Sequence, residues 1–246
     1  MPVAKNMIDV LNKIYKGSKE SFYETVKEKM EKEEKAFIIT ANPEIIMIAE
    51  KRTEIKEILL SDEAIIIPDG FSVVKRGRNM GVHIEEKIPG IDLVQNFLKF
   101  ANENNKSIYC YGSKEETERG LEDVLRKTYP NVKIEGLKNG YDYTEEEVFA
   151  DIKTKKPDII LVAMGVPRQE QIAAKHYDDL EKGIIIGVGG SLDVLSGSKK
   201  RAPKFFRKRN LEWLYRILRE PRRIKRFYKY NIKFYLQTGK RRRRTK

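Results

Sequence analysis

The sequence predicts an α/β protein: a Rossmann-like, doubly wound, mostly parallel sheet of about six strands with a basic amphipathic helical appendage at the C-terminus. Three observations lead to this prediction. From residue 36 to residue 190, short apolar runs alternate with longer amphipathic ones, as strands and helices do around a parallel sheet. Several of the short runs are continuously apolar, which is typical of strands covered by helices on both faces. The positive charge is concentrated in residues 199–246.

Six apolar runs are predicted as the strands, in chain order residues 36–40, 64–67, 107–111, 132–137, 158–164 and 183–188. Helix start signals lie between them. Two pairs predict capping boxes, Ser113 with Glu116 and Thr144 with Glu147. Pro43 suits the first position of a helix over residues 43–60. We expect residues 1–35 to form helices on the edge of the domain.

Net charge divides the chain in two. Residues 199–246 hold 21 Lys and Arg against two acidic residues, a net charge of +19. Residues 1–198 hold 29 basic and 35 acidic residues, a net charge of −6. We therefore predict a core domain over residues 1–198 and an appendage over residues 199–246.

The composition restricts the chemistry. One cysteine and two histidines leave little for a disulfide framework, a Cys/His metal site or a Ser-His-Asp triad, and we expect both histidines in solvent. The chain has no Asp-x-Asp pair, so no metal is expected. It also lacks a run of 18 apolar residues, so neither a membrane-spanning helix nor a signal peptide is expected.

The residues that follow the predicted strands are the candidate site, because ligands of such sheets bind at the carboxyl ends of the strands. Almost every strand is followed by glycine and a polar group. These residues are Thr40 and Asn42; Asp69 and Gly70; Gly112 and Ser113; Asn139, Gly140 and Tyr141; Gly165, Arg168 and Gln169; and Gly189, Gly190 and Asp193. The pattern favours a polar ligand that contains phosphate.

Two of these places have clear alternatives. The stretch "GVGGSLDVLSG", residues 187–197, could let its backbone approach a diphosphate at a helix start, with Asp193 on ribose hydroxyls. It could equally be a plain glycine-rich turn with a helix-capping Asp. Asp69 in "IIIPDGF" is either a general base or part of a Pro-Asp-Gly turn. Asn42, directly before Pro43, is either a site residue or only a helix N-cap.

The C-terminal appendage combines apolar and basic side chains. Before Pro221, four apolar residues recur at helical spacing: Leu211, Leu214, Tyr215 and Leu218. Pro221 ends this helix and can open a second one with the apolar residues Ile224, Phe227 and Tyr228. Four arginines would form a cationic ridge: Arg216, Arg219, Arg223 and Arg226. A bilayer interface uses both kinds of side chain, whereas nucleic acid needs only the charge. A helical pair with a solvated basic face is the third alternative.

Several motifs occur together in one order: "TANPEI", "PDG", "PGIDL", "YGSKEET", "MGVPRQE", "GVGGSLDVLSG", "KRAP" and "LEWLYRILREPRRIKRF". In these motifs, from about residue 38 to residue 228, the chain resembles the TagA/WecG/CpsF family of bacterial glycosyltransferases (glycosyltransferase family 26), in particular those of wall teichoic acid synthesis. The resemblance implies a metal-independent, inverting transfer of N-acetylmannosamine from UDP-N-acetylmannosamine. The acceptor would be N-acetylglucosamine on undecaprenyl diphosphate, and the product a β-1,4-linked disaccharide-lipid.

The resemblance also implies roles for individual residues. Asp69 would be the base, with Thr40 and Asn42 in the sugar site. The expected substrate-binding residues are Gln169, Arg168, Gly112, Gly189, Gly190 and Asp193, with Tyr141 covering uracil. From the pattern of the appendage itself we predict that it seats the enzyme on the membrane, with Arg216, Arg223 and Arg226 reaching the substrate diphosphates. The expected place is the cytoplasmic face of the bacterial cell membrane, on anionic lipid and without nucleic acid.

Two other functions remain open from the residues alone. A nucleic-acid-binding α/β protein with a basic arm would suit the terminal "GKRRRRTK". A nucleotide-binding regulator would need no catalysis. The sequence leaves the oligomeric state undetermined, a homo-oligomer included.

Overall fold

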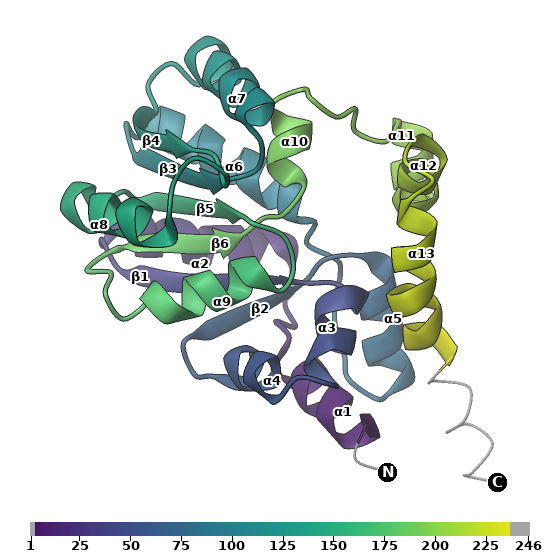
Figure 1. The fold of residues 1–246 in the computed structure, drawn as a ribbon. Helices are drawn as coiled ribbons and strands as arrows, with labels where there is room; N and C mark the ends of the chain where they lie inside the picture. The colour runs from purple at the N-terminus through teal and green to yellow at the C-terminus, as the bar shows by residue number, and fades with distance from the viewer. Residues whose placement is uncertain (1–2, 237–246) are drawn as a thin grey trace, which may run out of the picture.

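The computed structural model describes residues 3–236 and contains one six-stranded sheet (Figure 1). The strands are β1 (Lys35–Ala41), β2 (Ala64–Pro68), β3 (Ser107–Gly112), β4 (Lys133–Lys138), β5 (Ile159–Ala163) and β6 (Gly183–Gly187). All six predicted strands are confirmed, each to within one residue at either end. The predicted fold class is confirmed as well.

The sheet order is β2-β1-β6-β5-β3-β4, and every neighbouring pair is parallel. The chain builds β1 and β2 on one side, crosses to β3 and β4 on the other, and then places β5 and β6 between them. Because the strands are parallel, their carboxyl ends share one edge of the sheet, called the carboxyl edge below.

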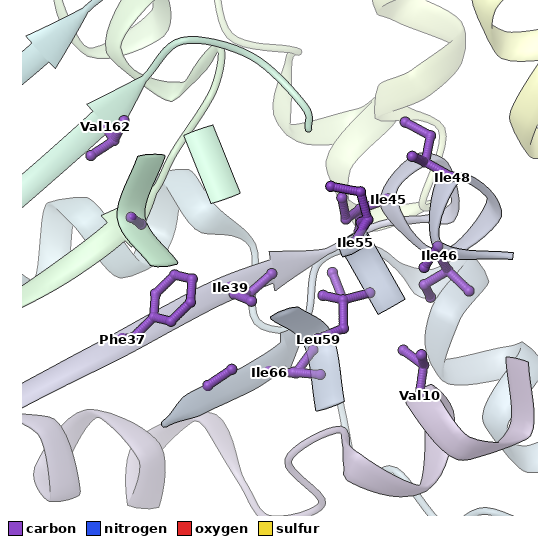
Figure 2. Packing of buried hydrophobic residues seen from close by; sticks show 14 of the residues in the cluster. Val10, Phe37, Ile39, Ile45, Ile46, Ile48, Ile55, Leu59, Ile66 and Val162 are labelled. Carbon is purple, nitrogen blue, oxygen red and sulfur yellow. The ribbon is translucent and has the colours of Figure 1, made fainter. Parts of the chain in front are cut away.

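Helices cover both faces of the sheet, as the apolar strands require (Figure 1). One face carries α1 (Val3–Lys13), α3 (Pro43–Ala49), α4 (Thr53–Leu60), α5 (Phe71–Asn79), α8 (Glu145–Lys155) and α9 (Arg168–His176). The other carries α2 (Lys19–Glu31), α6 (Gly90–Glu103), α7 (Glu115–Thr128) and α10 (Ser191–Leu195). Alternate strand residues point to opposite faces. Phe37 and Ile39 therefore pack in the core on the side of α1, called the first core (Figure 2). Ile38 packs in the core on the side of α2, called the second core.

The helix predictions have mixed outcomes. Pro43 is confirmed at the start of α3, and the Thr144 capping box is confirmed at the start of α8. The single helix over residues 43–60 is wrong, because Arg52 is extended and separates α3 from α4. The Ser113 capping box is also wrong: α7 begins after Lys114, and the Ser113 hydroxyl donates to Asp193 instead.

Two further expectations fail on packing. Residues 1–35 are not confined to an edge, because α2 packs on β1, β6 and α6. His176 is not solvated. It is 9% exposed, its ring stacks on Phe149 at a centroid distance of 3.9 Å, and its Nε2 lies 2.9 Å from Glu145 Oε1.

The C-terminal segment, residues 199–236, runs along the carboxyl edge next to α3 and α5 (Figure 1). It contains α11 (Lys204–Lys208), α12 (Glu212–Arg219), α13 (Arg223–Phe227) and the π-helical η1 (Tyr228–Ile232). The predicted break at Pro221 is confirmed, since it falls between α12 and α13. The basic terminus over residues 239–246 lies outside the described residues.

Several contacts hold the C-terminal segment to the core. Phe234 is fully buried in the first core, beneath the guanidinium of Arg76. Arg201 pairs with Asp92. Further side-chain contacts between the segment and the core include Lys87 with Asn210 and Glu44 with Arg226. Within residues 3–236, no helix has both the length and the apolar character needed to cross a membrane.

Candidate active site

A cavity of about 450 Å³ lies at the carboxyl edge, between the sheet and the C-terminal segment. It collects ten of the thirteen residues for which an individual catalytic or binding role was predicted from the sequence: Thr40, Asn42, Asp69, Gln169, Gly189, Gly190, Asp193, Arg216, Arg223 and Arg226. The other three residues with a predicted role do not line it: Gly112, Tyr141 and Arg168. Residues that the sequence analysis did not assign to the site also line it, among them Glu44, Glu212, Trp213, Phe227 and Asn231.

Asp69 brings a carboxylate to the cavity directly after β2. Its own N–H donates to the Ala41 carbonyl at 2.8 Å, and its Oδ1 accepts from the Gly90 N–H at 3.4 Å. Burial raises the pKa of the Asp69 carboxyl to about 6, although the Arg216 guanidinium acts in the opposite direction. The Glu212 carboxylate adds to the increase. A carboxylate with a pKa this close to neutral pH has the property that a general base needs.

Thr40 and Asn42 use their side-chain oxygens within the protein. The Thr40 hydroxyl donates to the Gly187 carbonyl at 2.9 Å and is buried. Asn42 Oδ1 accepts from the N–H groups of Glu44 and Ile45. The N-cap alternative for Asn42 is thus confirmed, and its place at the cavity makes both functions compatible.

The glycine turn, residues 187–190, follows β6 and is held from behind by a buried side chain. The Gly189 N–H donates to Gln169 Oε1 at 2.9 Å, with Gly189 at a left-handed φ of +48°. Gln169 is only 1% exposed, and its Nε2 donates to Glu170 Oε1 at 2.8 Å. In the described part of the chain, the N–H of Gly190 donates to no protein group. This N–H is therefore available to a ligand.

Asp193 has partners on both carboxylate oxygens. Oδ1 accepts from Ser113 Oγ at 2.7 Å and from Thr117 Oγ1 at 3.1 Å, and Oδ2 lies 2.7 Å from Lys199 Nζ. Burial alone would raise the pKa of Asp193, but the bonds from Lys199 and Ser113 outweigh it and lower the pKa. A ribose hydroxyl would have to exchange with one of these partners.

The C-terminal segment supplies the other wall of the cavity. Residues spaced by three and four face it from both helices: Trp213, Arg216 and Ile217 from α12, and Arg223, Arg226 and Phe227 from α13. The rings of Trp213 and Phe227 stack at 4.5 Å with an interplanar angle of 11°. The residues of α12 that face the cavity are therefore not those of the apolar stripe predicted from the sequence, which were Leu211, Leu214, Tyr215 and Leu218.

Each of the three predicted arginines has an acidic partner. Arg216 pairs with Glu212 at 3.0 Å, Arg223 with Glu220 at 2.8 Å and Arg226 with Glu44 at 2.7 Å. No sequence signal linked Glu44 to Arg226, because the two residues are 182 positions apart.

The three predicted residues outside the cavity have identifiable surroundings. A Cβ on Gly112 would lie 2.7 Å from the Ala163 backbone, so this glycine serves close packing of β3 on β5. Arg168 is exposed at the start of α9. Tyr141 is 76% exposed, and its loop touches the cavity margin, because the Gly140 N–H donates to the Ser113 carbonyl. The uracil contact of Tyr141 stays a prediction.

The described residues include no cluster of three or more His, Cys, Asp or Glu side chains that could hold a metal ion. One polar cavity combines a carboxylate of raised pKa, a backbone N–H without an acceptor among residues 3–236 and several arginine side chains. This combination suits a reaction in which a hydroxyl loses a proton and a phosphate-bearing group leaves.

Comparison with known proteins agrees with the resemblance seen in the motifs. The model of the glycosyl transferase WecG/TagA/CpsF family matches residues 8–246. A protein of Staphylococcus aureus (strain MW2), named N-acetylglucosaminyldiphosphoundecaprenol N-acetyl-beta-D-mannosaminyltransferase, is 38% identical over 199 residues, which cover 81% of this chain and 78% of that protein. Proteins of the same name from strains NCTC 8325 and MRSA252 match with the same identity and coverage. None of these findings supports a nucleic-acid-binding protein.

Proposed function

The chain belongs to the WecG/TagA/CpsF family of glycosyl transferases, and from that premise we propose that it transfers N-acetylmannosamine from a UDP donor to N-acetylglucosaminyl-diphospho-undecaprenol. The names of the staphylococcal relatives state this acceptor and this sugar. The product is the β-1,4-linked disaccharide on the lipid diphosphate.

The observation that carries the proposal is the carboxylate of Asp69 in one cavity with Arg216, Arg223 and Arg226. The acceptor hydroxyl gives its proton to Asp69 while its oxygen bonds to the anomeric carbon of N-acetylmannosamine. The bond between that carbon and the UDP oxygen breaks, and the configuration inverts. A base with a pKa of about 6 is largely ionised at pH 7 and can still accept the proton.

The leaving diphosphate needs positive charge or N–H donors as its own charge develops. The three arginines and the free N–H of Gly190 are the groups that can supply them. Arginine binds phosphate oxygens through paired N–H groups. We expect turnover without a divalent cation, and activity lost on chelation with EDTA and restored by a metal would contradict this.

Membrane association is the second part of the proposal. Most large apolar side chains exposed among residues 3–236 lie in the C-terminal segment: Phe205, Trp213, Leu218, Ile224, Tyr228, Tyr235 and Leu236. They are interspersed with lysine and arginine, the combination that interfacial helices use on anionic lipid. We propose that this surface seats the enzyme on the inner face of the cell membrane, where the lipid-linked acceptor is held.

The direct test is incubation of the full chain with UDP-N-acetylmannosamine and the lipid-linked acceptor in anionic vesicles. Mass spectrometry should detect the disaccharide-lipid, and proton NMR of the released sugar should show a β linkage. UDP-N-acetylglucosamine serves as the donor control. No product from either donor would refute the proposed reaction, and product from the control donor alone would refute the sugar.

A further inference from the structure

Glu170 follows Gln169 at the start of α9 and has no exposed surface. Its Oε1 accepts from Gln169 Nε2 at 2.8 Å. Its Oε2 has no hydrogen-bond partner among the described residues. Because burying a carboxylate with an unpartnered oxygen is unfavourable, its presence here calls for an explanation other than stability.

The bonds around Gln169 define one orientation of its amide. In its ionised form the Glu170 carboxylate can only accept hydrogen bonds, and Gln169 directs its NH₂ toward it. Its oxygen then points the other way, toward the N–H of Gly189, which can only donate. With the amide turned around, two oxygens would face each other and two N–H donors would face each other.

The glycine turn depends on this amide at two points. A Cβ on Gly187 would lie 2.9 Å from Gln169 Nε2, so the turn and the amide are in close contact. Gly189 keeps its left-handed conformation while its N–H is bonded to Gln169. The Thr40 hydroxyl holds the Gly187 carbonyl. Glu170 thus orients the amide, the amide holds the turn, and the turn places Gly190, whose N–H has no acceptor among the described residues, at the cavity.

We propose that Glu170 is a positioning residue for the sugar-nucleotide donor, which it affects only through Gln169 and the glycine turn. This inference rests on the proposed function, because it takes the donor diphosphate as the group that the turn binds. It assigns Gln169 to the support of the turn and not to direct contact with substrate.

The environment of Glu170 agrees with a role outside folding. Burial raises the pKa of its carboxyl to about 7, and the Glu44 carboxylate adds to the increase. Replacing such a group by an apolar side chain of similar size removes its desolvation cost, which offsets the cost of leaving the buried Gln169 NH₂ without an acceptor, so stability should change little. A loss of donor affinity without a loss of stability would therefore identify the positioning role.

The test measures UDP-N-acetylmannosamine affinity by calorimetry on the full chain, together with thermal unfolding. Glu170→Met removes the acceptor for the Gln169 amide. We expect about a tenfold weaker donor affinity, roughly 1.4 kcal/mol, at an unchanged or higher melting temperature. Glu170→Gln keeps an acceptor at the same place and should restore the affinity to within about threefold of wild type.

Glu50→Met is the matched control. Burial also raises the pKa of Glu50 to about 7, but Glu50 lies at the C-terminal end of α3 and does not line the cavity. We expect this variant to change the melting temperature and to leave donor affinity as it was.

A swapped pair keeps the test decisive if Glu170→Met does not fold. In the double variant Gln169→Glu with Glu170→Gln, the amide at 170 donates to the carboxylate at 169, which still accepts from Gly189. Both bonds survive, so affinity should stay within about threefold of wild type. A donor affinity about tenfold below wild type in this double variant would show that Gln169 itself contacts the donor, and would overturn the inference.

The outcomes separate the inference from the function on which it rests. Wild-type affinity in a folded Glu170→Met protein overturns the positioning role alone. A wild-type protein that binds no UDP-sugar overturns the proposed donor and the inference together.

Discussion

The two walls of the cavity are held in place by different kinds of contact. On the sheet side, the side chains of Thr40 and Gln169 hold the Gly187 carbonyl and the Gly189 N–H, and the Asp193 carboxylate accepts from Ser113. On the side of the C-terminal segment, the arginines form ion pairs while keeping much of their surface in solvent, with Arg226 54% exposed. Exposed ion pairs contribute little to stability, whereas buried networks rigidify. The sheet wall is therefore formed in advance, whereas the arginine side chains of the other wall can rearrange at small cost.

Removing the adjustable wall should have the largest effect. Deletion of residues 199–246 takes away the three cavity arginines and the exposed apolar side chains. We expect the loss of transfer to lipid-linked acceptor and of cosedimentation with anionic vesicles, which in the full chain should fall as salt is added. A core over residues 1–198 should remain folded, although it loses the buried Phe234.

The deletion also tests the division into core and appendage. Circular dichroism and UDP calorimetry on residues 1–198 give the two readouts. A truncated chain that turns over lipid-linked acceptor at the full-length rate would contradict the assignment of the arginines. An unfolded one would show that residues 199–246 are part of the core.

Asp69→Asn acts on the preformed wall and should reduce turnover by roughly 10²–10⁴-fold, the usual contribution of a general base. The substitution keeps the size and a hydrogen-bond acceptor for Gly90, so the fold and UDP affinity should change little. Single-turnover measurements at saturating donor isolate the chemical step. Activity within a few-fold of wild type would return Asp69 to the role of a turn residue.

The same base predicts a pH profile. Because the Asp69 carboxyl must be ionised to accept the proton, kcat/KM should rise with pH and level off above its pKa of about 6. Glu212 contributes to that raised pKa, so Glu212→Gln should move the midpoint to lower pH. A midpoint that does not move would show that the Glu212 carboxylate does not raise the pKa of the catalytic group.

Phe234→Ala tests what holds the adjustable wall to the core. Phe234 is fully buried, and removing such a ring typically costs about 3–5 kcal/mol of unfolding free energy. Leu236 is 65% exposed two residues later, and Leu236→Ala is the control, with an expected change below about 0.5 kcal/mol. Urea unfolding gives the values, and trypsin cleavage within residues 199–236 reports local release. Equal values for both variants would mean that Phe234 does not hold the segment.

The difference between the walls also explains what the sequence could predict. Several strands were predictable because both of their faces are covered, so they read as continuous apolar runs, such as "GIIIGV" across β6. The Thr144 capping box was predictable because both partners lie within one helical turn. Placing Asp69 and the glycine turn at one edge followed from parallel strands alone.

The failures come from partners that are distant in sequence. Ser113 satisfies the local capping pattern, but its hydroxyl binds Asp193, 80 residues away. The break at Arg52 depends on packing of α3 and α4 on the first core, which no local pattern contains. The wall formed by the C-terminal segment depends on Glu44 and on the burial of Phe234, and neither has a local signal.

A small effect on stability is also expected at Arg226, whose ion pair with Glu44 is exposed on the arginine side. Arg226→Gln and Glu44→Gln each break this pair and should each change the unfolding free energy by no more than about 1 kcal/mol.

The effects of Arg226→Gln and Glu44→Gln on catalysis should differ. Without Arg226 the cavity loses a phosphate partner, so kcat/KM for the donor should fall roughly tenfold, the size of one charge-assisted hydrogen bond. Without the Glu44 carboxylate, Arg226 is released toward the cavity and donor affinity should hold or increase. Equal losses of kcat/KM in both variants would mean that Arg226 acts only by attaching α13 to α3, and that the adjustable wall is structural.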